Sequence, residues 1–185
     1  MTLILASASP RRSELLRNAG LAFTVEPAHV SEQSRPNEQP LMYAQRLARD
    51  KARAVFERHP DNVVLGADTV VVVDEHLLEK PENEQDAARM LRLLSGRSHH
   101  VITGVCLVAP GYEHTEAEIT EVRFGLLTHS EIADYVKTGE PMDKAGAYAI
   151  QGLASKYIEK VEGCYFNVVG LPVSMVYRHL KSLAP

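Results

Sequence analysis

Short apolar runs alternate along the chain with segments whose apolar residues recur at helical spacing. This alternation predicts an α/β fold in which a mixed sheet is flanked by helices. The predicted strands cover, in chain order, residues 3–6, 22–30, 62–74, 99–108, 115–126 and 155–161. The predicted helices cover residues 10–18, 40–58, 83–94 and 128–139, and a last helix begins at Pro172.

Polar loops connect these elements, among them residues 31–39 and 140–152. The chain has neither internal repeats nor low-complexity stretches. With 185 residues and 45% hydrophobic composition, it is long enough to bury one good core. We therefore expect residues 1–185 to form a single domain, arranged as two lobes around a cleft.

The first strand and helix are joined by a turn that favours anion binding. Ser9 stands at the N-cap position, Pro10 suits the first helical position, and Arg11 and Arg12 follow in the first turn. Two arginines oppose the helix dipole there, a cost that makes sense if a polyphosphate lies in front of them. A solvated basic helix start is the alternative interpretation.

Asp68 interrupts the most apolar stretch of the chain, between Val63–Ala67 and Val70–Val73. This stretch predicts a central strand that is covered on both faces. Burying a carboxylate there without partners costs several kcal/mol. Asp68 is therefore either hydrogen-bonded at a strand bend near Gly66 or exposed to a cleft as a metal ligand or base.

Two further charged residues are candidates for the same chemistry. Lys51 falls on the apolar stripe of the 40–58 helix, where it is either a snorkelling lysine or a phosphate ligand. Glu32 lies in the loop after the second strand, near the predicted carboxyl edge of the sheet, where ligands gather in open α/β folds. Taken alone, Glu32 is equally consistent with an ordinary loop residue.

Composition and charge indicate which kinds of binding partner to expect. The formal net charge is −4, aromatic residues make up 6% of the chain, and Trp is absent, so we expect no nucleic-acid partner. The two cysteines, Cys106 and Cys164, match no metal-binding spacing and are expected to be reduced thiols. No stretch has the length of a signal peptide or a membrane span, so we expect a cytoplasmic protein without a membrane partner.

Other well-known catalytic motifs are missing from the sequence. It contains no GxSxG, HExxH, Walker or GxGxxG motif. Its eight histidines do not cluster at ligand spacing. His99 and His100 are neighbours on a predicted strand and should therefore face opposite ways.

Five segments together resemble the Maf family of nucleoside triphosphate pyrophosphatases. They are SASPRR at 7–12, RLARDKA at 46–52, GADTVV at 66–71, TGEPMDKAGAYAIQG at 138–152 and NVVGLP at 167–172. The resemblance implies an elongated α/β fold with a deep cleft, similar to the inosine triphosphate pyrophosphatases. It also implies hydrolysis of a nucleoside triphosphate to the monophosphate and pyrophosphate, with a divalent cation.

Within this family, the chain is most similar to the subgroup that acts on dTTP and UTP. The subgroup's pattern matches at Arg12, Thr69 and Gln151, which are expected to set specificity, and the family's proton-accepting aspartate matches Asp68. The physiological substrate would be a normal or a modified pyrimidine nucleotide, in a house-cleaning role. The sister group that acts on 7-methyl-GTP is the second interpretation, and a non-enzymatic division regulator that binds nucleotides or nucleic acid is the third.

The residues and the resemblance together predict one site. The residues expected to hold the triphosphate are Ser7, Arg11, Arg12, Lys51 and Lys80. Glu32 and Asp68 are expected to bind Mg²⁺ or Mn²⁺, with Asp68 as ligand or base.

The predicted site also includes a base-reading residue. Gln151 has a donor and an acceptor that suit the O4/N3 edge of uracil or thymine. Thr69 should point away from Asp68 by strand alternation. The half-exposed strand at 115–126 offers an edge through which a homodimer could pair.

Overall fold

The computed structural model of the protein describes residues 2–183, which form a seven-stranded mixed sheet with helices around it. The strands are β1 (Leu3–Leu5), β2 (Phe23–Val25), β3 (Val63–Val73), β4 (His76–Leu78), β5 (Ser98–Ala109), β6 (Tyr112–Phe124) and β7 (Ile158–Glu162). The α-helices are α1 (Pro10–Asn18), α2 (Pro40–Phe56), α3 (Glu84–Leu94), α4 (His129–Lys137), α5 (Tyr165–Val169) and α6 (Val173–Leu183). Three short 3₁₀ turns are η1 (Glu140–Asp143), η2 (Ala145–Ala147) and η3 (Leu153–Tyr157).

The strand order is β2-β1-β3-β5-β6-β7, and β4 pairs with β3 off this path. Strand β1 is parallel to both β2 and β3, whereas β3 with β4 and β6 with β7 are antiparallel. The predicted α/β class with a mixed sheet is therefore confirmed.

The chain forms two compact units, and β3, β5 and β6 run through both. The first unit contains the described residues up to Thr69, then Thr103–Glu118, and the described residues from Gly170 onward. The second contains Val70–Ile102 and Ile119–Val169. The expected single domain and its cleft stay predictions.

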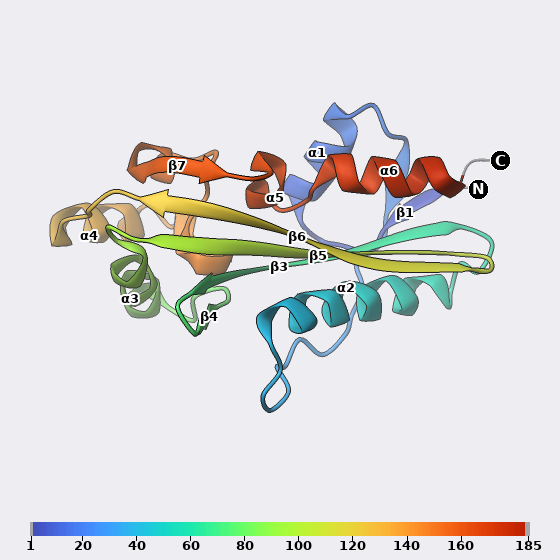
Figure 1. The fold of residues 1–185 in the computed structure, drawn as a ribbon, viewed down its shortest axis with the longest axis horizontal. Coiled ribbons are helices and arrows are strands. Elements are labelled where there is room, and N and C mark those ends of the chain that lie inside the picture. The colour runs from blue at the N-terminus through green and yellow to red at the C-terminus, as the bar shows by residue number, and fades with distance from the viewer. Residues whose placement is uncertain (1, 184–185) are drawn as a thin grey trace. The chain divides into compact units, whose positions relative to one another are not determined.

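In the first unit, α2 lies on one side of the strands, and α1 and α6 lie on the other (Figure 1). Helix α2 comes unusually close to the sheet because glycine faces it. A Cβ atom at Gly66 would lie 2.1 Å from the Ala48 carbonyl oxygen, and one at Gly104 would lie 2.2 Å from that of Ala44. The residues of this helix–sheet core are Ile4, Ala6, Ala48, Ala52, Val55, Val64, Cys106 and Val108.

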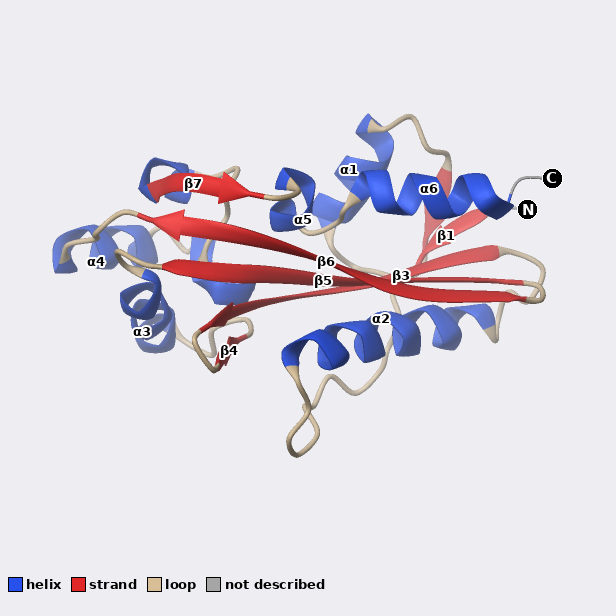
Figure 2. Ribbon diagram, in the orientation of Figure 1, coloured by secondary structure: helices blue, strands red, loops and turns tan. Residues whose placement is uncertain are grey.

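In the second unit, α3 contacts the turns η1 and η2, and it also contacts α4, which lies beside it in Figure 2. The capping box predicted for α4 is present, with Thr128 and Glu131 bonded to each other's backbone N–H groups. His99 is buried, and its ring makes edge-to-face contacts with the rings of Phe124 and Tyr148. His100 is exposed, so the predicted opposite orientation of the two histidines is confirmed.

The structure also differs from the predicted elements. Strand β2 is only three residues long, because its partner β1 ends at Leu5 and the ladder ends with it. Strand β4 was not predicted; it returns along β3 after a turn in which Asp74 takes a left-handed φ of 52°. Helix α5 was not predicted either, and the predicted 140–152 loop contains two 3₁₀ turns.

Both cysteines are free thiols, as predicted. Burial raises the pKa of the Cys106 thiol to about 11, which keeps it protonated and unreactive at neutral pH. Among residues 2–183, no helix has the length and apolar character that a membrane span requires. The cytoplasmic location stays a prediction.

Candidate active site

Lys51 joins the two predicted metal-binding carboxylates in the first unit. Its ammonium nitrogen lies 2.7 Å from Oδ1 of Asp68 and 2.7 Å from Oε1 of Glu32. Lys51 and Asp68 are each only 8% exposed, whereas the Glu32 side chain is 55% exposed. Three residues that are far apart in the sequence therefore form one charged cluster whose outer member reaches solvent.

The local sequence explains this placement. Lys51 lies on the buried stripe of α2 with Leu47 and Val55, as the helical spacing predicted. Asp68 lies in the middle of β3, two residues after the glycine that admits α2 against the sheet. The close approach brings the lysine of the helix to the aspartate of the strand.

Burial dominates the electrostatics of Asp68. Loss of hydration raises the pKa of its carboxyl group above the usual 3.8, and the nearby positive charges of Lys51 and Arg12 offset part of that rise. The negative charge of Glu32, like burial, raises the pKa of Asp68. Because its pKa is raised, Asp68 is a stronger base than a free aspartate.

Arg12 is buried and bonds the residues on both sides of Asp68, at the Ala67 backbone and at the Thr69 side chain. Its Nη1 donates to the Ala67 carbonyl oxygen at 2.9 Å, and its Nη2 donates to Oγ1 of Thr69 at 3.0 Å. Its Nε donates to the Gly170 carbonyl oxygen at 2.9 Å. These contacts use most of the N–H donors of the guanidinium within the protein. They indicate that Arg12 positions Asp68.

Thr69 is tied to the same network on the side away from Asp68. Its hydroxyl lies 2.9 Å from the hydroxyl of Thr103 on β5, while Asp68 bonds Lys51 instead. Sequence reasoning did not identify Thr103, although a polar residue within the apolar run from Val101 to Val105 was a signal for it. The contribution of Gly170 is a backbone carbonyl, which no residue type could have indicated.

Ser7 and Arg11 lie at the predicted phosphate-binding turn. The Ser7 hydroxyl accepts hydrogen bonds from Nη1 of Arg12 at 3.1 Å and from the Ser9 N–H at 3.2 Å. The first turn of α1 has no acidic residue, and Ser9 is its N-cap but makes no side-chain cap. Arg11 is half-buried in this turn, so α1 presents its positive end beside the Arg12 network.

Two predicted site residues belong to the second unit. Lys80 is exposed just after β4, and Gln151 is exposed in the turn before η3. Their participation with the residues of the first unit stays a prediction.

Glu140 anchors the turn that carries Gln151. Its carboxylate accepts hydrogen bonds from the Leu153 N–H at 3.0 and 3.1 Å and from the Tyr135 hydroxyl at 2.8 Å. A Cβ atom at Gly152 would lie 2.4 Å from this carboxylate, so the contact requires glycine there. Sequence reasoning missed Glu140, because an acidic residue at the start of a loop gives no signal of a turn 13 residues later.

The donor set suits a hard divalent cation. Asp68 and Glu32 both direct a carboxylate oxygen at one positive centre, the Lys51 ammonium. Carboxylate oxygens are the protein ligands that Mg²⁺ and Mn²⁺ prefer. The residues present therefore fit the predicted metal.

Comparison with known proteins identifies the family of this chain. The family model described as Maf-like protein matches residues 2–183. A protein of Koribacter versatilis (strain Ellin345) named dTTP/UTP pyrophosphatase is 61% identical over 181 residues, covering 98% of this chain and 94% of that protein. Proteins of the same name from Geobacillus sp. (strain WCH70) and Aquifex aeolicus (strain VF5) are 51% and 43% identical. They cover 98% and 99% of this chain, and the chain covers 97% and 96% of theirs.

Proposed function

The chain belongs to the family of Maf-like proteins, and from this membership we propose that it hydrolyses dTTP and UTP to the nucleoside monophosphate and pyrophosphate. Relatives that are 43–61% identical over nearly the whole chain carry the name dTTP/UTP pyrophosphatase, which supports the reaction and the substrates. The structural observation that carries the proposal is the buried Asp68, which is paired with Lys51 and lies within reach of Glu32.

The reaction breaks the bond between the α-phosphorus and the oxygen that bridges to the β-phosphate. A water molecule attacks the α-phosphorus, its proton passes to an Asp68 carboxylate oxygen, and pyrophosphate leaves. The raised pKa of Asp68 favours this proton transfer. Arg12 keeps the carboxylate in place by holding residues 67 and 69.

Positive charge for the triphosphate comes from the turn before α1 and from α2. We propose that Ser7, Arg11 and Lys51 contact the phosphates, with Arg12 supporting them and Lys80 contributing from the second unit. Such positioning and charge stabilisation supply most of what phosphoryl transfer requires of a protein.

We propose Mg²⁺ or Mn²⁺ as the cofactor, held by Glu32 and Asp68. When bound, the ion lowers the pKa of a coordinated water and offsets phosphate charge. Lys51 and Arg12 together already offset the charges of these two carboxylates, so an added cation meets repulsion unless a triphosphate brings negative charge with it. The residues therefore favour joint binding of ion and nucleotide.

For substrate selection, we propose that Gln151 pairs with the O4/N3 edge of the pyrimidine. In one fixed orientation, its amide N–H donates to O4 and its carbonyl oxygen accepts from N3–H of uracil or thymine, whereas cytosine requires the flipped amide. Glu140 would keep the Gln151 turn in the conformation that presents this amide.

A nucleotide panel tests the proposal. The full chain is incubated with dTTP, UTP, CTP, GTP and 7-methyl-GTP, with Mg²⁺, Mn²⁺ or EDTA, and products are separated by ion-exchange chromatography. We expect monophosphate and pyrophosphate from dTTP and UTP, with a metal requirement. Orthophosphate and diphosphate products, or turnover restricted to 7-methyl-GTP, would contradict it. Asp68→Asn protein purified in parallel excludes a contaminating hydrolase.

A further inference from the structure

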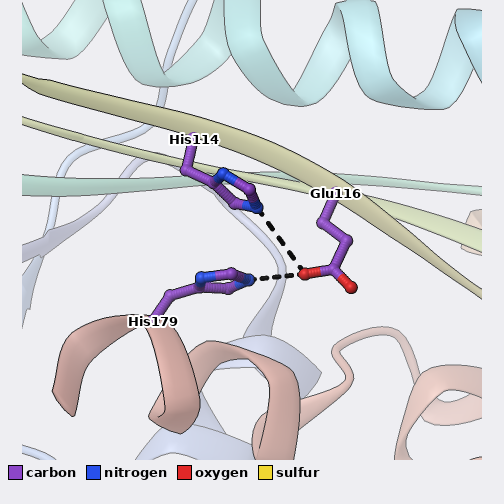
Figure 3. Close-up of side chains that lie close together, drawn as sticks. All are labelled: His114, Glu116 and His179. Atoms are coloured by element: carbon purple, nitrogen blue, oxygen red, sulfur yellow. Dashed lines mark hydrogen bonds and ion pairs between the residues drawn. The ribbon is translucent and has the colours of Figure 1, made fainter. Parts of the chain in front are cut away.

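We propose that His114, Glu116 and His179 form a second metal site, which binds a transition-metal ion of the zinc class on the first unit. Figure 3 shows the three side chains directed toward one another, His114 and Glu116 from β6 and His179 from α6. This site shares no residue with the Lys51 cluster. It goes beyond the proposed hydrolysis and does not depend on it.

The strand and the helix place the three ligands for simple reasons. His114 and Glu116 are two residues apart on β6, so their side chains leave the same face of the strand. His179 lies 63 positions after Glu116 in the sequence, on the helix that packs beside this strand. The sequence showed no histidine cluster because only tertiary packing brings the third ligand near.

The ligand atoms already converge. Nε2 of His179 lies 2.6 Å from Oε2 of Glu116, and Nε2 of His114 lies 3.7 Å from the same oxygen. All three candidate ligand atoms lie within 4.8 Å of one another. Two ligands of one tetrahedral zinc ion are about 3.4 Å apart, so small side-chain rotations suffice.

The donor chemistry selects the class of ion. Two imidazoles and one carboxylate suit Zn²⁺ and its neighbours Co²⁺ and Ni²⁺, whereas Mg²⁺ and Ca²⁺ prefer oxygen ligands alone. The ion that suits Glu32 and Asp68 is therefore a poor match here. The side chains of His114 and Glu116 are 44% and 38% exposed, so an ion can reach them from solvent.

Arg178 is the main competitor for the carboxylate. Its Nη2 lies 3.1 Å from each oxygen of Glu116, and its own side chain is 63% exposed. A metal ion must share or displace this contact. Removing the guanidinium should therefore strengthen metal binding. If the three residues formed only a surface ion-pair cluster, this substitution would not raise the affinity for metal.

Zinc titration of the metal-stripped full chain tests the site. Isothermal titration calorimetry at fixed pH is run in the Asp68→Asn background, which removes the carboxylate expected to bind the catalytic ion. We expect one Zn²⁺ per chain, weakened about tenfold or more by His114→Ala and by Glu116→Gln, and tightened by Arg178→Gln. His100→Ala, an exposed histidine on β5, is the matched control and should leave binding unchanged.

Two results would overturn the site. One is equal zinc uptake by the parent and by the His114→Ala variant. The other is visible absorption of bound Co²⁺ that does not change in that variant. Because His114 is exposed, its substitution should leave the fold intact, which circular dichroism checks. Loss of pyrophosphatase activity in Asp68→Asn has no bearing on these readouts, so the two proposals fail separately.

Discussion

Arg12 and Thr69 meet in a hydrogen bond of 3.0 Å between a guanidinium N–H and the threonine hydroxyl. The bond connects the first turn of α1 to the residue that follows Asp68 on β3. The bond connects Thr69 to the Asp68 site, although the Thr69 side chain points away from Asp68. Arg12 and Thr69 therefore act on the carboxylate indirectly, through the segment of β3 that carries it.

This relationship predicts different outcomes for the two neighbouring arginines. Arg12→Lys keeps the charge but cannot reproduce the fork that reaches Ala67, Thr69 and Gly170. Losing buried hydrogen bonds from a charged group costs about 1.5–3 kcal/mol each. We expect a clear fall in the melting temperature and in kcat/KM for every nucleotide.

Arg11→Lys is the matched control for Arg12→Lys. A lysine at position 11 still supplies a point charge to phosphate, so we expect stability within about 0.5 kcal/mol of the parent and substantial activity. Thermal unfolding and steady-state kinetics of both variants check the contrast. Equal behaviour of the two variants would show that Arg12 has no special positioning role.

Asp68→Asn should lower kcat by about 10²–10⁴, the usual contribution of a general base. Asparagine has nearly the same shape but cannot take the proton from water. Asp61→Asn, at an exposed turn before β3, is the control and should leave kcat unchanged. Turnover near the parent value in folded Asp68→Asn protein would exclude its role as the base.

The pH profile gives an independent measure of Asp68. The base must be ionised, and burial raises its pKa above 3.8, so activity should fall as pH decreases through that raised pKa. We expect the acid limb of kcat/KM to lie above pH 3.8 and to vanish from the residual activity of Asp68→Asn. A limb that survives the substitution belongs to another group.

The Gln151 turn should govern base preference more than maximal rate. Gln151→Ala removes one donor and one acceptor, so discrimination between UTP and CTP should fall roughly threefold to tenfold for each lost hydrogen bond. Gly152→Ala should act similarly, because its Cβ displaces the Glu140 carboxylate that anchors the turn.

Leu153→Ala separates this effect from general damage to the loop. Its side chain is exposed, and the bond to Glu140 comes from its backbone N–H, which alanine keeps. We expect the parent preference to persist in this variant. If kcat/KM for UTP and CTP falls equally in Gln151→Ala, the proposed base reading is wrong.

His99 should make the fold sensitive to acid. Burial lowers the pKa of its imidazole to about 3, whereas the unfolded chain has the ordinary value near 6.5. Between these values the unfolded state binds a proton that the folded state does not. The His99 contribution to stability is therefore complete above pH 6.5 and falls by up to about 1.4 kcal/mol per pH unit toward pH 3.

His99→Gln tests this acid sensitivity, since glutamine can still bond the Tyr148 hydroxyl that lies 2.7 Å from Nε2. Urea unfolding between pH 4 and pH 6 should give a shallower dependence of the unfolding free energy on pH than in the parent. His100→Gln, on the exposed side of β5, should keep the parent slope. Identical slopes for all three proteins would place the titrating group elsewhere.

The sequence alone predicted most of the helices and strands and showed which of their residues are chemically unusual. Helical spacing placed Lys51 on a buried stripe, and an apolar run with one carboxylate identified Asp68. Local signals suffice here because periodicity and capping act within one element. They placed α1, α2, α3, α4 and the start of α6 to within two residues but missed α5, and β2 and β4 depended on partners that lie elsewhere in the chain.

Only the tertiary structure decided which of these residues meet. The decisive contacts join distant segments of the chain. They are the ion pairs of Lys51 with Glu32 and Asp68, the hydrogen bonds of Arg12 on both sides of Asp68, and the contact of His179 with Glu116. Arg12 bonds the backbone carbonyl groups of Ala67 and Gly170, and because every residue has such a group, no residue type could indicate these contacts. Such contacts follow from the packing of helix on sheet, where glycine allows close approach, and a one-dimensional pattern does not contain that geometry.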